Sequence, residues 1–541
     1  MAGTTMDRAL PGRKGLKADA VGFVNGVVVG VASTAPAYSL AASLGFVVIA
    51  VGAQSPAIML LAFFPMAAIA AAYYYLNRVD PDCGTSFTWV SRAMGPWLGW
   101  MTGWAIIVAD IIVMANLAEI AAVYTFLLVG IDTYAMEDIL FSIGPADAPT
   151  IAVTLGDAII IGAGIAWIAA MTWISYIGIE ISARVQFVLL AVEIVTLGLF
   201  TIMALAAVYG ILGTAPADAV LPSLDWLNPL AIVAQDDPGA GFSPTALAAG
   251  LVVAVFIYWG WDSTVSINEE SKDPYRGPGK AALVSTVLLV LTFVLVSIAA
   301  QAFHGPQFLA DNAESEDVLG ALGLDVMGDP LYLLLIVSIL TSAAASTLTT
   351  ILPTARTAFS MADHKALPEY WGRVHPRYLT PSTATLGMGV LSIAFYGALR
   401  LISANVLYDA IAALGMMIAF YYGLTGFASV IYFRRLLAKS VRHLVLVGLV
   451  PLFGGVVLAW MLWESLWELS NPENTYTGAS WFGFGPPVVI AVFFTVLGLV
   501  LMVAQRIYQP AFFRHRLEAA EPGALDIRPP EELMEGPGII G

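Results

Sequence analysis

Long apolar runs dominate this chain, and most are about as long as the twenty residues that a helix needs to cross a bilayer. Short polar segments with glycine, proline and charged residues separate these runs. The pattern predicts an all-α polytopic membrane protein with twelve transmembrane helices. The predicted spans are 21–50, 56–76, 97–128, 155–176, 181–212, 245–268, 281–303, 331–355, 383–399, 404–433, 443–467 and 486–508.

The first span, which includes the run 26–45, contains Ser33, Thr34 and Pro36 at its middle. Proline lacks an N–H and crowds the carbonyl four residues earlier, so carbonyls near Ala32 lose partners and amides near Ser33 and Thr34 become available. Free backbone in hydrocarbon is tolerated only inside protein or beside a wet cavity. The pattern therefore indicates either a binding site or a kinked helix whose hydroxyls satisfy the backbone.

A second span is also interrupted by glycine and polar residues. Residues 255–264 read Val-Phe-Ile-Tyr-Trp-Gly-Trp-Asp-Ser-Thr, with Gly260, Asp262 and Ser263 inside a hydrophobic stretch. Two interrupted spans at corresponding places in two halves of a chain are typical of transporters built from inverted repeats. The second interruption therefore favours a binding site over a simple kink.

The basic residues indicate how the chain crosses the membrane. With the N-terminus inside, all but one of the 23 lysines and arginines fall in inner segments, and only Arg400 lies outside. Cytoplasmic loops collect such residues. We therefore predict a multi-pass protein of the cytoplasmic membrane, with both termini in the cytoplasm and acidic outer loops. The expected divisions are 1–20 (N-terminal segment), 21–435 (helices 1–10), 436–508 (helices 11 and 12) and 509–541 (charged, proline-rich tail).

The sequence contains few of the features that an enzyme would require. It is 59% hydrophobic and 11% charged, and its one cysteine, Cys83, excludes an internal disulfide. We find no metal-ligand spacing, no cofactor motif and no GxxxxGK[ST] nucleotide-binding loop. A membrane-embedded enzyme would need a nucleophile–base pair or a metal cluster, so we predict no catalytic residues. The histidines lie in loops or at helix ends; they are His304, His364, His375, His443 and His515.

Four motifs together resemble the amino acid–polyamine–organocation (APC) superfamily of permeases. The run Gly-Val-Ala-Ser-Thr-Ala-Pro-Ala-Tyr-Ser-Leu (30–40) resembles the unwound first helix of that family, and 256–276 resembles its sixth-helix signature, in which an aromatic–Gly–acid core leads to Glu-Glu. The stretch 84–99 is similar to the loop before the third helix, and 355–381 to the segment after the eighth. In family order these motifs cover most of residues 20–435.

The resemblance implies a LeuT-type fold, a 5+5 inverted repeat of helices 1–5 and 6–10 with discontinuous helices 1 and 6. Substrate would lie between those two helices, flanked by helices 3, 8 and 10. The implied function is secondary active transport of amino acids or related amines by alternating access, with proton coupling favoured. A polyamine or cationic amino acid exchanger and a sodium symporter remain alternatives, as does a transporter-shaped receptor that binds substrate without flux. No nucleic-acid partner is expected.

Helical rise brings the candidate residues to one depth, about 17 to 23 Å from the ends of their spans. Asp110, Glu119, Glu193 and Asp262 lie inside spans where no basic side chain is evident, so each carboxylate requires a proton, water or an imported cation. The candidate substrate residues are Ala32, Ser33, Thr34, Ala35, Asp110, Met114, Phe256, Tyr258, Trp259 and Gly260. The candidates for ion or proton coupling are Glu193, Ser342, Ser346, Thr347, Glu119 and Asp262.

Individual roles follow partly from the resemblance. Amides of 32–35 would bind a substrate carboxylate, and Phe256 matches the aromatic gate of the family. Asp110 lies where the third helix of the family faces the pocket, which suits a side-chain amine of the substrate; alternatively it is a protonated aspartate bonded to a neighbouring helix. Glu193 stands where some proton-coupled relatives carry lysine. Ser342, Ser346 and Thr347 would complete a sodium site, or serve close helix packing.

Overall fold

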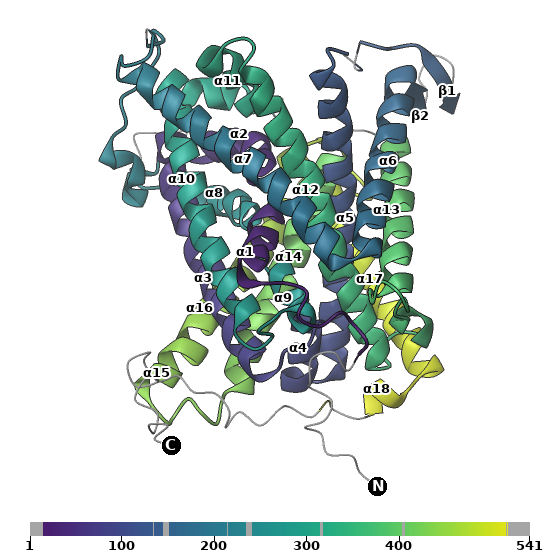
Figure 1. Ribbon diagram of the computed structural model, residues 1–541. Helices are drawn as coiled ribbons and strands as arrows, with labels where there is room; N and C mark the ends of the chain where they lie inside the picture. Colours follow the sequence, from purple (N-terminus) through teal and green to yellow (C-terminus); the bar gives the residue numbers. More distant parts are fainter. Residues whose placement is uncertain are drawn as a thin grey trace, which may run out of the picture.

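The computed structural model describes residues 14–131, 133, 135–143, 151–213, 215–233, 241–313, 318–402, 406–514 and 517. Within them the chain is a bundle of long helices with one small β-hairpin (Figure 1). The first thirteen residues, most of the predicted tail and His515 lie outside this part of the chain. The long helices run between the two ends of the molecule, as expected for a membrane protein.

The first half of the bundle contains α1 (Phe23–Ala32), α2 (Pro36–Val51), α3 (Ser55–Val79), α4 (Ser86–Met94), α5 (Pro96–Leu128), α6 (Leu155–Ile177) and α7 (Ile179–Val208). The strands β1 (Ile139–Ile143) and β2 (Ile151–Thr154) pair antiparallel between α5 and α6. Short 3₁₀ turns are η2 (Gly52–Gln54), η3 (Leu224–Leu227) and η4 (Pro229–Ala231).

The second half contains α8 (Pro244–Ile257), α9 (Ser263–Ser266), η6 (Asn268–Glu270), α10 (Gly277–Asp311), α11 (Val318–Met327), α12 (Tyr332–Asp363), η8 (Glu369–Gly372), α13 (Ser382–Ile402) and α14 (Val406–Tyr432). The chain continues through α15 (Val441–His443), the π-helical turn η9 (Leu444–Leu449), α16 (Val450–Glu468), η10 (Pro472–Asn474), α17 (Pro486–Tyr508) and α18 (Ala511–Arg514).

Ten helical stretches of the described chain are long and apolar enough to cross a membrane. The first of them, 23–79, contains two of the predicted spans, and the predicted sixth span corresponds to the shorter α8. The protein is therefore a multi-pass membrane protein, while the count of twelve crossings stays a prediction.

The first span is interrupted where the sequence predicted. Helix α1 ends at Ala32, and Ala35 adopts a left-handed backbone with φ 46° and ψ 61°. Pro36 then begins α2, where its missing N–H costs no helical hydrogen bond. Hydroxyls satisfy part of the freed backbone, since Thr34 Oγ1 donates to the Val31 carbonyl at 2.7 Å and Ser39 Oγ to the Thr34 carbonyl at 2.6 Å. The helix is thus broken, and its hydroxyls also bond the backbone as the kink hypothesis expected.

The predicted interruption of the second span is also present. Helix α8 ends at Ile257, and the chain turns before α9 begins at Ser263. Gly260 has φ 118°, and a Cβ there would lie 2.5 Å from the Ser33 carbonyl oxygen. Only glycine fits this turn without strain, because the backbone conformation and the contact with Ser33 both exclude a side chain.

Helix α5 occupies the interior of the bundle and packs along α12 and α14, and α12 also packs against α7 (Figure 1). Helices α16 and α17 lie further out and expose large apolar side chains such as Trp463 and Phe493. Helix α10 carries a kink at Gly305 and packs against α3, α7 and α1. The interior helices therefore hold the two interruptions between them, and the outer helices provide an apolar surface.

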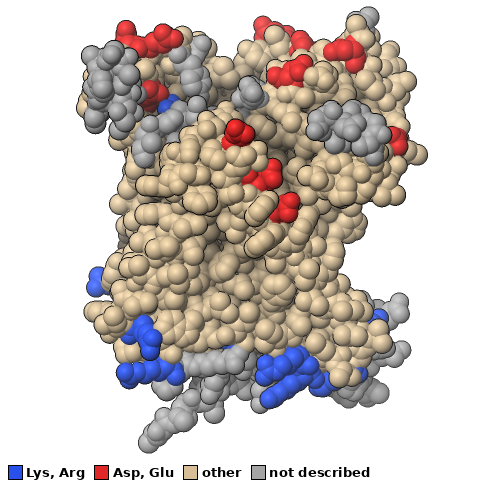
Figure 2. Space-filling model, turned by 180° about the vertical axis from the view of Figure 1, so that it is seen from behind, with Lys and Arg blue, Asp and Glu red and all other residues tan. Residues whose placement is uncertain are grey.

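Charged side chains separate toward the two ends of the molecule. In the face shown in Figure 2, lysine and arginine lie mainly near the lower end, and aspartate and glutamate near the upper end. We name these the basic end and the acidic end. This separation matches the charge pattern along the sequence, although the orientation in a membrane stays a prediction.

Candidate functional site

The two interruptions meet inside the bundle. Ser33 Oγ, in the first break, lies 2.7 Å from Ser263 Oγ, at the start of α9. Ser346 Oγ, on α12, donates to the Ser33 carbonyl at 2.9 Å. The structure thus brings the candidates Ser33, Ser346 and Gly260 together with Ser263, since a Cβ on Gly260 would meet the same Ser33 carbonyl. Thr347 is buried beside them, but its hydroxyl donates to the Ala343 carbonyl of its own helix.

The free backbone donors are not where the sequence analysis placed them. The amides of Ser33, Thr34 and Ala35 donate to the carbonyls of Val29, Val31 and Ala32, respectively. The prediction that the amides near Ser33 and Thr34 are available is therefore wrong, because the last turn of α1 tightens and uses them. The available donors lie instead at the start of α2, where the first amides of a helix have no partner within it.

Glu193, on α7, faces this helix start. Its Oε1 accepts from the Ala37 amide at 2.7 Å and from Ser342 Oγ at 2.7 Å. Ser342 Oγ in turn accepts from the Tyr38 amide at 3.3 Å. The carboxyl is fully buried, and its Oε2 has no hydrogen-bond partner among the described residues. Glu193 and Ser342 therefore form one cluster at the positive end of α2, where a negative charge is favoured.

Asp110 and Asp262 form a second acidic region. Asp110, on α5, is 2% exposed, and its Oδ2 accepts from Thr354 Oγ1 on α12 at 2.9 Å. Asp262, next to Gly260, accepts from the Tyr422 hydroxyl on α14 at 2.8 Å. The two carboxyls are close enough to interact electrostatically. Across the described residues, no lysine, arginine or histidine forms an ion pair with either of them or with Glu193.

Tyrosines that the sequence analysis missed surround Asp262. The hydroxyls of Tyr73 and Tyr421 each lie 3.4 Å from its Oδ2, in addition to the bond from Tyr422. Tyr73 comes from α3, 189 residues away in the chain, so no local pattern pairs it with Asp262. The adjacent Tyr421 and Tyr422 inside an apolar span were the one available signal.

The predicted aromatic residues divide into different environments. The indole N–H of Trp259 donates to the Tyr421 hydroxyl, which places Trp259 beside the Asp262 region. The Tyr258 hydroxyl donates to the Met59 carbonyl of α3 at 2.8 Å, so Tyr258 points into helix packing. Phe256 is partly buried against the main core, and Met114 is fully buried within it.

A family model described as "Amino acid permease" matches residues 19–493. The chain belongs to this amino acid permease family. The permease is 26% identical over 406 residues to an uncharacterized transporter of Mycobacterium tuberculosis, covering 73% of this chain and 77% of the relative.

Two further relatives have more specific descriptions. The human large neutral amino acids transporter small subunit 2 is 24% identical over 426 residues, covering 77% of the permease and 70% of the relative. The vacuolar cationic amino acid transporter 4 of Arabidopsis thaliana is 24% identical over 351 residues, covering 61% and 51%. Permeases of this family are transporters and not enzymes.

Glu119 has basic and hydroxyl partners that the sequence analysis did not predict. Arg400 Nε, on α13, lies 3.1 Å from Glu119 Oε1, and the Tyr396 hydroxyl donates to Oε2 at 2.8 Å. Arg400 also pairs with Asp157 on α6 at 2.9 Å. The expectation that Glu119 has no basic partner is therefore wrong, because Arg400, assigned to an outer segment, turns inward and is 6% exposed. Glu119 thus links α5 to α13, and Arg400 links α13 to α6.

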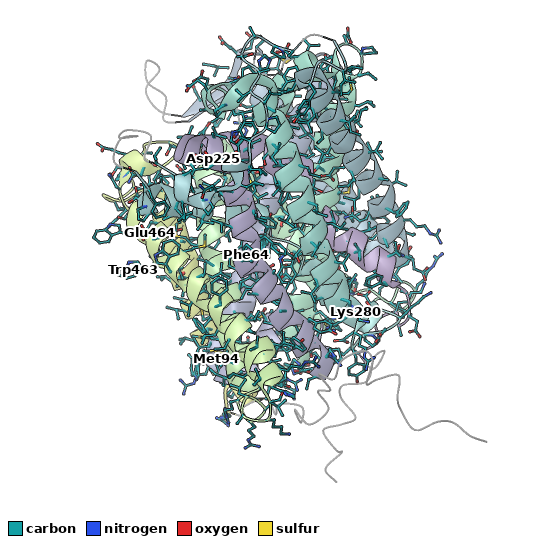
Figure 3. All side chains as sticks on the ribbon, turned by 90° about the vertical axis from the view of Figure 1, so that its left-hand side faces the viewer. Phe64, Met94, Asp225, Lys280, Trp463 and Glu464 are labelled. Atoms are coloured by element: carbon teal, nitrogen blue, oxygen red, sulfur yellow. The ribbon has the colours of Figure 1, made fainter. Side chains whose placement is uncertain are left out.

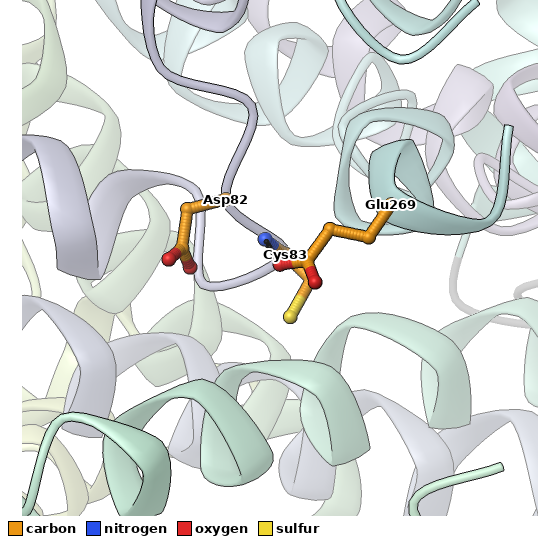
Figure 4. Close-up of side chains that lie close together, drawn as sticks. All are labelled: Asp82, Cys83 and Glu269. Carbon is orange, nitrogen blue, oxygen red and sulfur yellow. Dashed lines mark hydrogen bonds between the residues drawn. The ribbon is translucent and has the colours of Figure 1, made fainter. Parts of the chain in front are cut away.

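A buried ionic cluster lies toward the basic end of the permease. Lys14 Nζ donates to Asp82 Oδ2 at 2.9 Å and to Glu269 Oε1 at 2.8 Å, and it lies 3.9 Å from Cys83 Sγ. Figure 4 shows the Glu269 carboxylate beside Cys83, with Asp82 next to them. Their ligand atoms lie within 4.8 Å of one another, as in a metal site, but the Lys14 ammonium already supplies the positive charge there.

The charges of this cluster support one another. Burial alone would raise the pKa of Asp82, but Lys14 and the hydrogen bond from His364 hold that pKa well below its usual value. Burial would likewise lower the pKa of Lys14, but Asp82 keeps it well above the usual value. Behind the cluster, Arg356 donates through Nε and Nη2 to both carboxylate oxygens of Glu270 at 2.7 and 2.9 Å. The sequence showed these residues in motifs but not their pairing.

Proposed function

We propose that the permease is a secondary active transporter of amino acids or related amines that works by alternating access across the cytoplasmic membrane. The supporting observation is the meeting of the two interrupted spans through Ser33 and Ser263. Each break gives the chain a point at which a half-helix can move without the rest of the span. We further propose that helices 1–5 and 6–10 form a LeuT-type inverted repeat around this point, with both termini in the cytoplasm.

The chemistry of the site supports a substrate that carries an amine. Asp110 and Asp262 are both buried and have no basic partner in the described chain. An unpaired carboxylate is costly in a low-dielectric interior, and an ammonium or a proton brought from outside removes that cost. The relatives described as transporters of large neutral and of cationic amino acids support amino acids as the substrate class.

Glu193 is our candidate for coupling transport to protons. Its Oε1 holds the start of α2 through the Ala37 amide, and its Oε2 has no described partner, so it can take a proton without breaking that bond. Protonation would weaken the attraction between the carboxylate and the positive end of α2. The proton would thereby change how firmly α2 is held.

Reconstitution in liposomes tests this function. We expect the purified protein to take up labelled leucine, arginine or putrescine, faster under an inward proton gradient than without one. Gly260→Ala should abolish uptake, because its Cβ would collide with the Ser33 carbonyl. Gly198→Ala is the matched control, since a Cβ there meets nothing within 4 Å. Binding without uptake or exchange would show a receptor and overturn the proposal.

A further inference from the structure

A cavity of about 350 Å³ opens at the basic end, apart from the candidate transport site. None of the residues proposed for substrate or ion lines it. Its walls come from the beginnings of α1 and α10, from Thr264 of α9 and from the segment after η6. The lining residues that matter here are Gly26, Thr264, Lys272, Asp273 and Lys280.

The cavity carries positive charge. Lys272 and Lys280 are exposed in its lining, and neither forms an ion pair with a carboxylate of the described chain. Figure 3 shows Lys280 in the lower half of the molecule and Asp225 in the upper half. Asp273 also lines the cavity, but its Oδ1 accepts from the Arg276 amide at 3.2 Å and its carbonyl from the Gly277 amide at 2.8 Å. The positive end of α10 adds to the two lysines.

A buried hydroxyl points to a ligand in this cavity. Thr264 is 1% exposed, and its Oγ1 has no hydrogen-bond partner among the described residues. A Cβ on Gly26 would lie only 3.0 Å from that oxygen, so the glycine keeps space beside the hydroxyl. Leaving a buried hydroxyl without a partner is unfavourable. Together with the two ammonium groups it offers hydrogen-bond donors to a ligand that has negatively charged acceptor oxygens, such as a phosphate.

An apolar surface continues from the cavity into the membrane-spanning region. Phe23 and Val24 at the start of α1 are 48% and 63% exposed. Helix α10 exposes a strip of side chains at helical spacing, namely Val284, Val287, Leu288, Leu291 and Leu295. A free phosphate ion would not contact these apolar side chains, whereas the acyl chains of a lipid would cover them.

We propose that this cavity binds the phosphate group of an anionic membrane lipid through Lys272, Lys280 and Thr264, with the acyl chains along α10. Basic pockets between transmembrane helices at a cytoplasmic surface are suited to anionic headgroups. The lipid would lie against both α1 and α10. It would therefore hold the first half of the interrupted span against its neighbour.

Native mass spectrometry of the purified full-length protein tests the site, with phosphatidylglycerol and phosphatidylcholine as probes. We expect preferential retention of phosphatidylglycerol. Each lysine near a membrane surface contributes about a factor of five in affinity, so the double variant Lys272→Gln/Lys280→Gln should bind phosphatidylglycerol roughly 25-fold more weakly. Thr264→Val should also weaken it, without changing the charge. The control is Lys365→Gln/Lys439→Gln, two exposed lysines outside the cavity.

Equal retention of the two lipids, or unchanged phosphatidylglycerol binding by the lysine double variant, would overturn the proposal. Thermal stabilisation by inorganic phosphate as strong as that by phosphatidylglycerol would assign the cavity to a free anion instead, and would also overturn it. Thr264→Val keeps the test decisive if the double variant does not fold. Because binding is measured without transport, failure here leaves the proposed transport function unaffected.

Discussion

Ser33 and Ser263 are 230 residues apart in the chain, yet their hydroxyls lie 2.7 Å apart at the meeting point of the two interrupted spans. If this contact holds the breaks together, Ser33→Ala and Ser263→Ala should each reduce the initial rate of uptake, and the double variant should be no slower than the worse single one. Thr201→Ala is a suitable control, since that hydroxyl donates to Leu197 within its own helix. Fully additive losses would show that the two serines act separately.

Substitution of Asp110 tests whether the site binds a positively charged side chain of the substrate. Asp110→Asn keeps the size of the side chain and can still pair with Thr354, but it removes the charge. Hydrogen bonds to charged groups contribute about 1.5–3 kcal/mol, so uptake of arginine or putrescine should fall by about tenfold to a hundredfold. Uptake of leucine should change little. Thr354→Val controls for loss of the hydrogen bond alone, and undiminished arginine uptake in Asp110→Asn would refute the role.

Substitution of Glu193 tests whether this residue carries the proton that is coupled to transport. Glu193→Gln retains an oxygen that can accept from the Ala37 amide but cannot carry the proton. Uptake measured across a series of buffer pH values should therefore lose most of its pH dependence. Ser342→Ala removes the neighbouring bond and leaves the carboxyl in place, so its pH dependence should persist. A Glu193→Gln profile with the slope of the unmodified protein would assign the proton to another group.

These residues also show what a sequence can predict. The two breaks could be predicted because their causes are local: Pro36 cannot continue a hydrogen-bonded helix, and Gly260 adopts a conformation that other residues avoid. The pairing of Glu119 with Arg400 could not be predicted, because these residues are 281 positions apart and their contact depends on how two helices face one another. The hydropathy pattern indicates that both residues lie in or near membrane spans. It does not predict how each helix is rotated about its axis.

The backbone donors illustrate a finer limit. Pro36 correctly indicated that hydrogen bonds are lost in the first span, but it did not show which amides remain free. The last turn of α1 tightened to use the amides of Thr34 and Ala35, which left the start of α2 open to Glu193. That outcome depends on the φ and ψ angles of Ala35, which no residue type in the run dictates.

The ion pair of Arg356 and Glu270 should be essential for stability. Both side chains are almost completely buried, at 1% and 0% exposure. Arg356→Met would leave a buried carboxylate unpaired, which typically costs about 3–5 kcal/mol, so the melting temperature of the purified protein should fall sharply. The double variant Arg356→Met/Glu270→Gln should melt higher than the single variant. Lys17→Met breaks the exposed pair with Glu180, which is worth below about 1 kcal/mol, and should have little effect.

Cys83 gives a direct measure of whether the basic end opens. It is the only cysteine in the chain, it is fully buried, and the Lys14 ammonium lies 3.9 Å from its sulfur. We expect slow labelling by a maleimide in inside-out vesicles, both because the thiol is covered and because burial and Glu269 raise its pKa.

Lys14→Met should speed that labelling several-fold. The substitution leaves Asp82 and Glu269 without their shared cation, so the two carboxylates repel each other and the closed arrangement loses its main attraction. Loss of the Lys14 charge also acts to raise the pKa of Cys83, which by itself would slow the reaction. Faster labelling therefore reports opening of the basic end, which uncovers the thiol and removes the effect of burial on its pKa. Lys17→Met is the control, and equal or slower labelling in Lys14→Met would show that the basic end is held closed by other contacts.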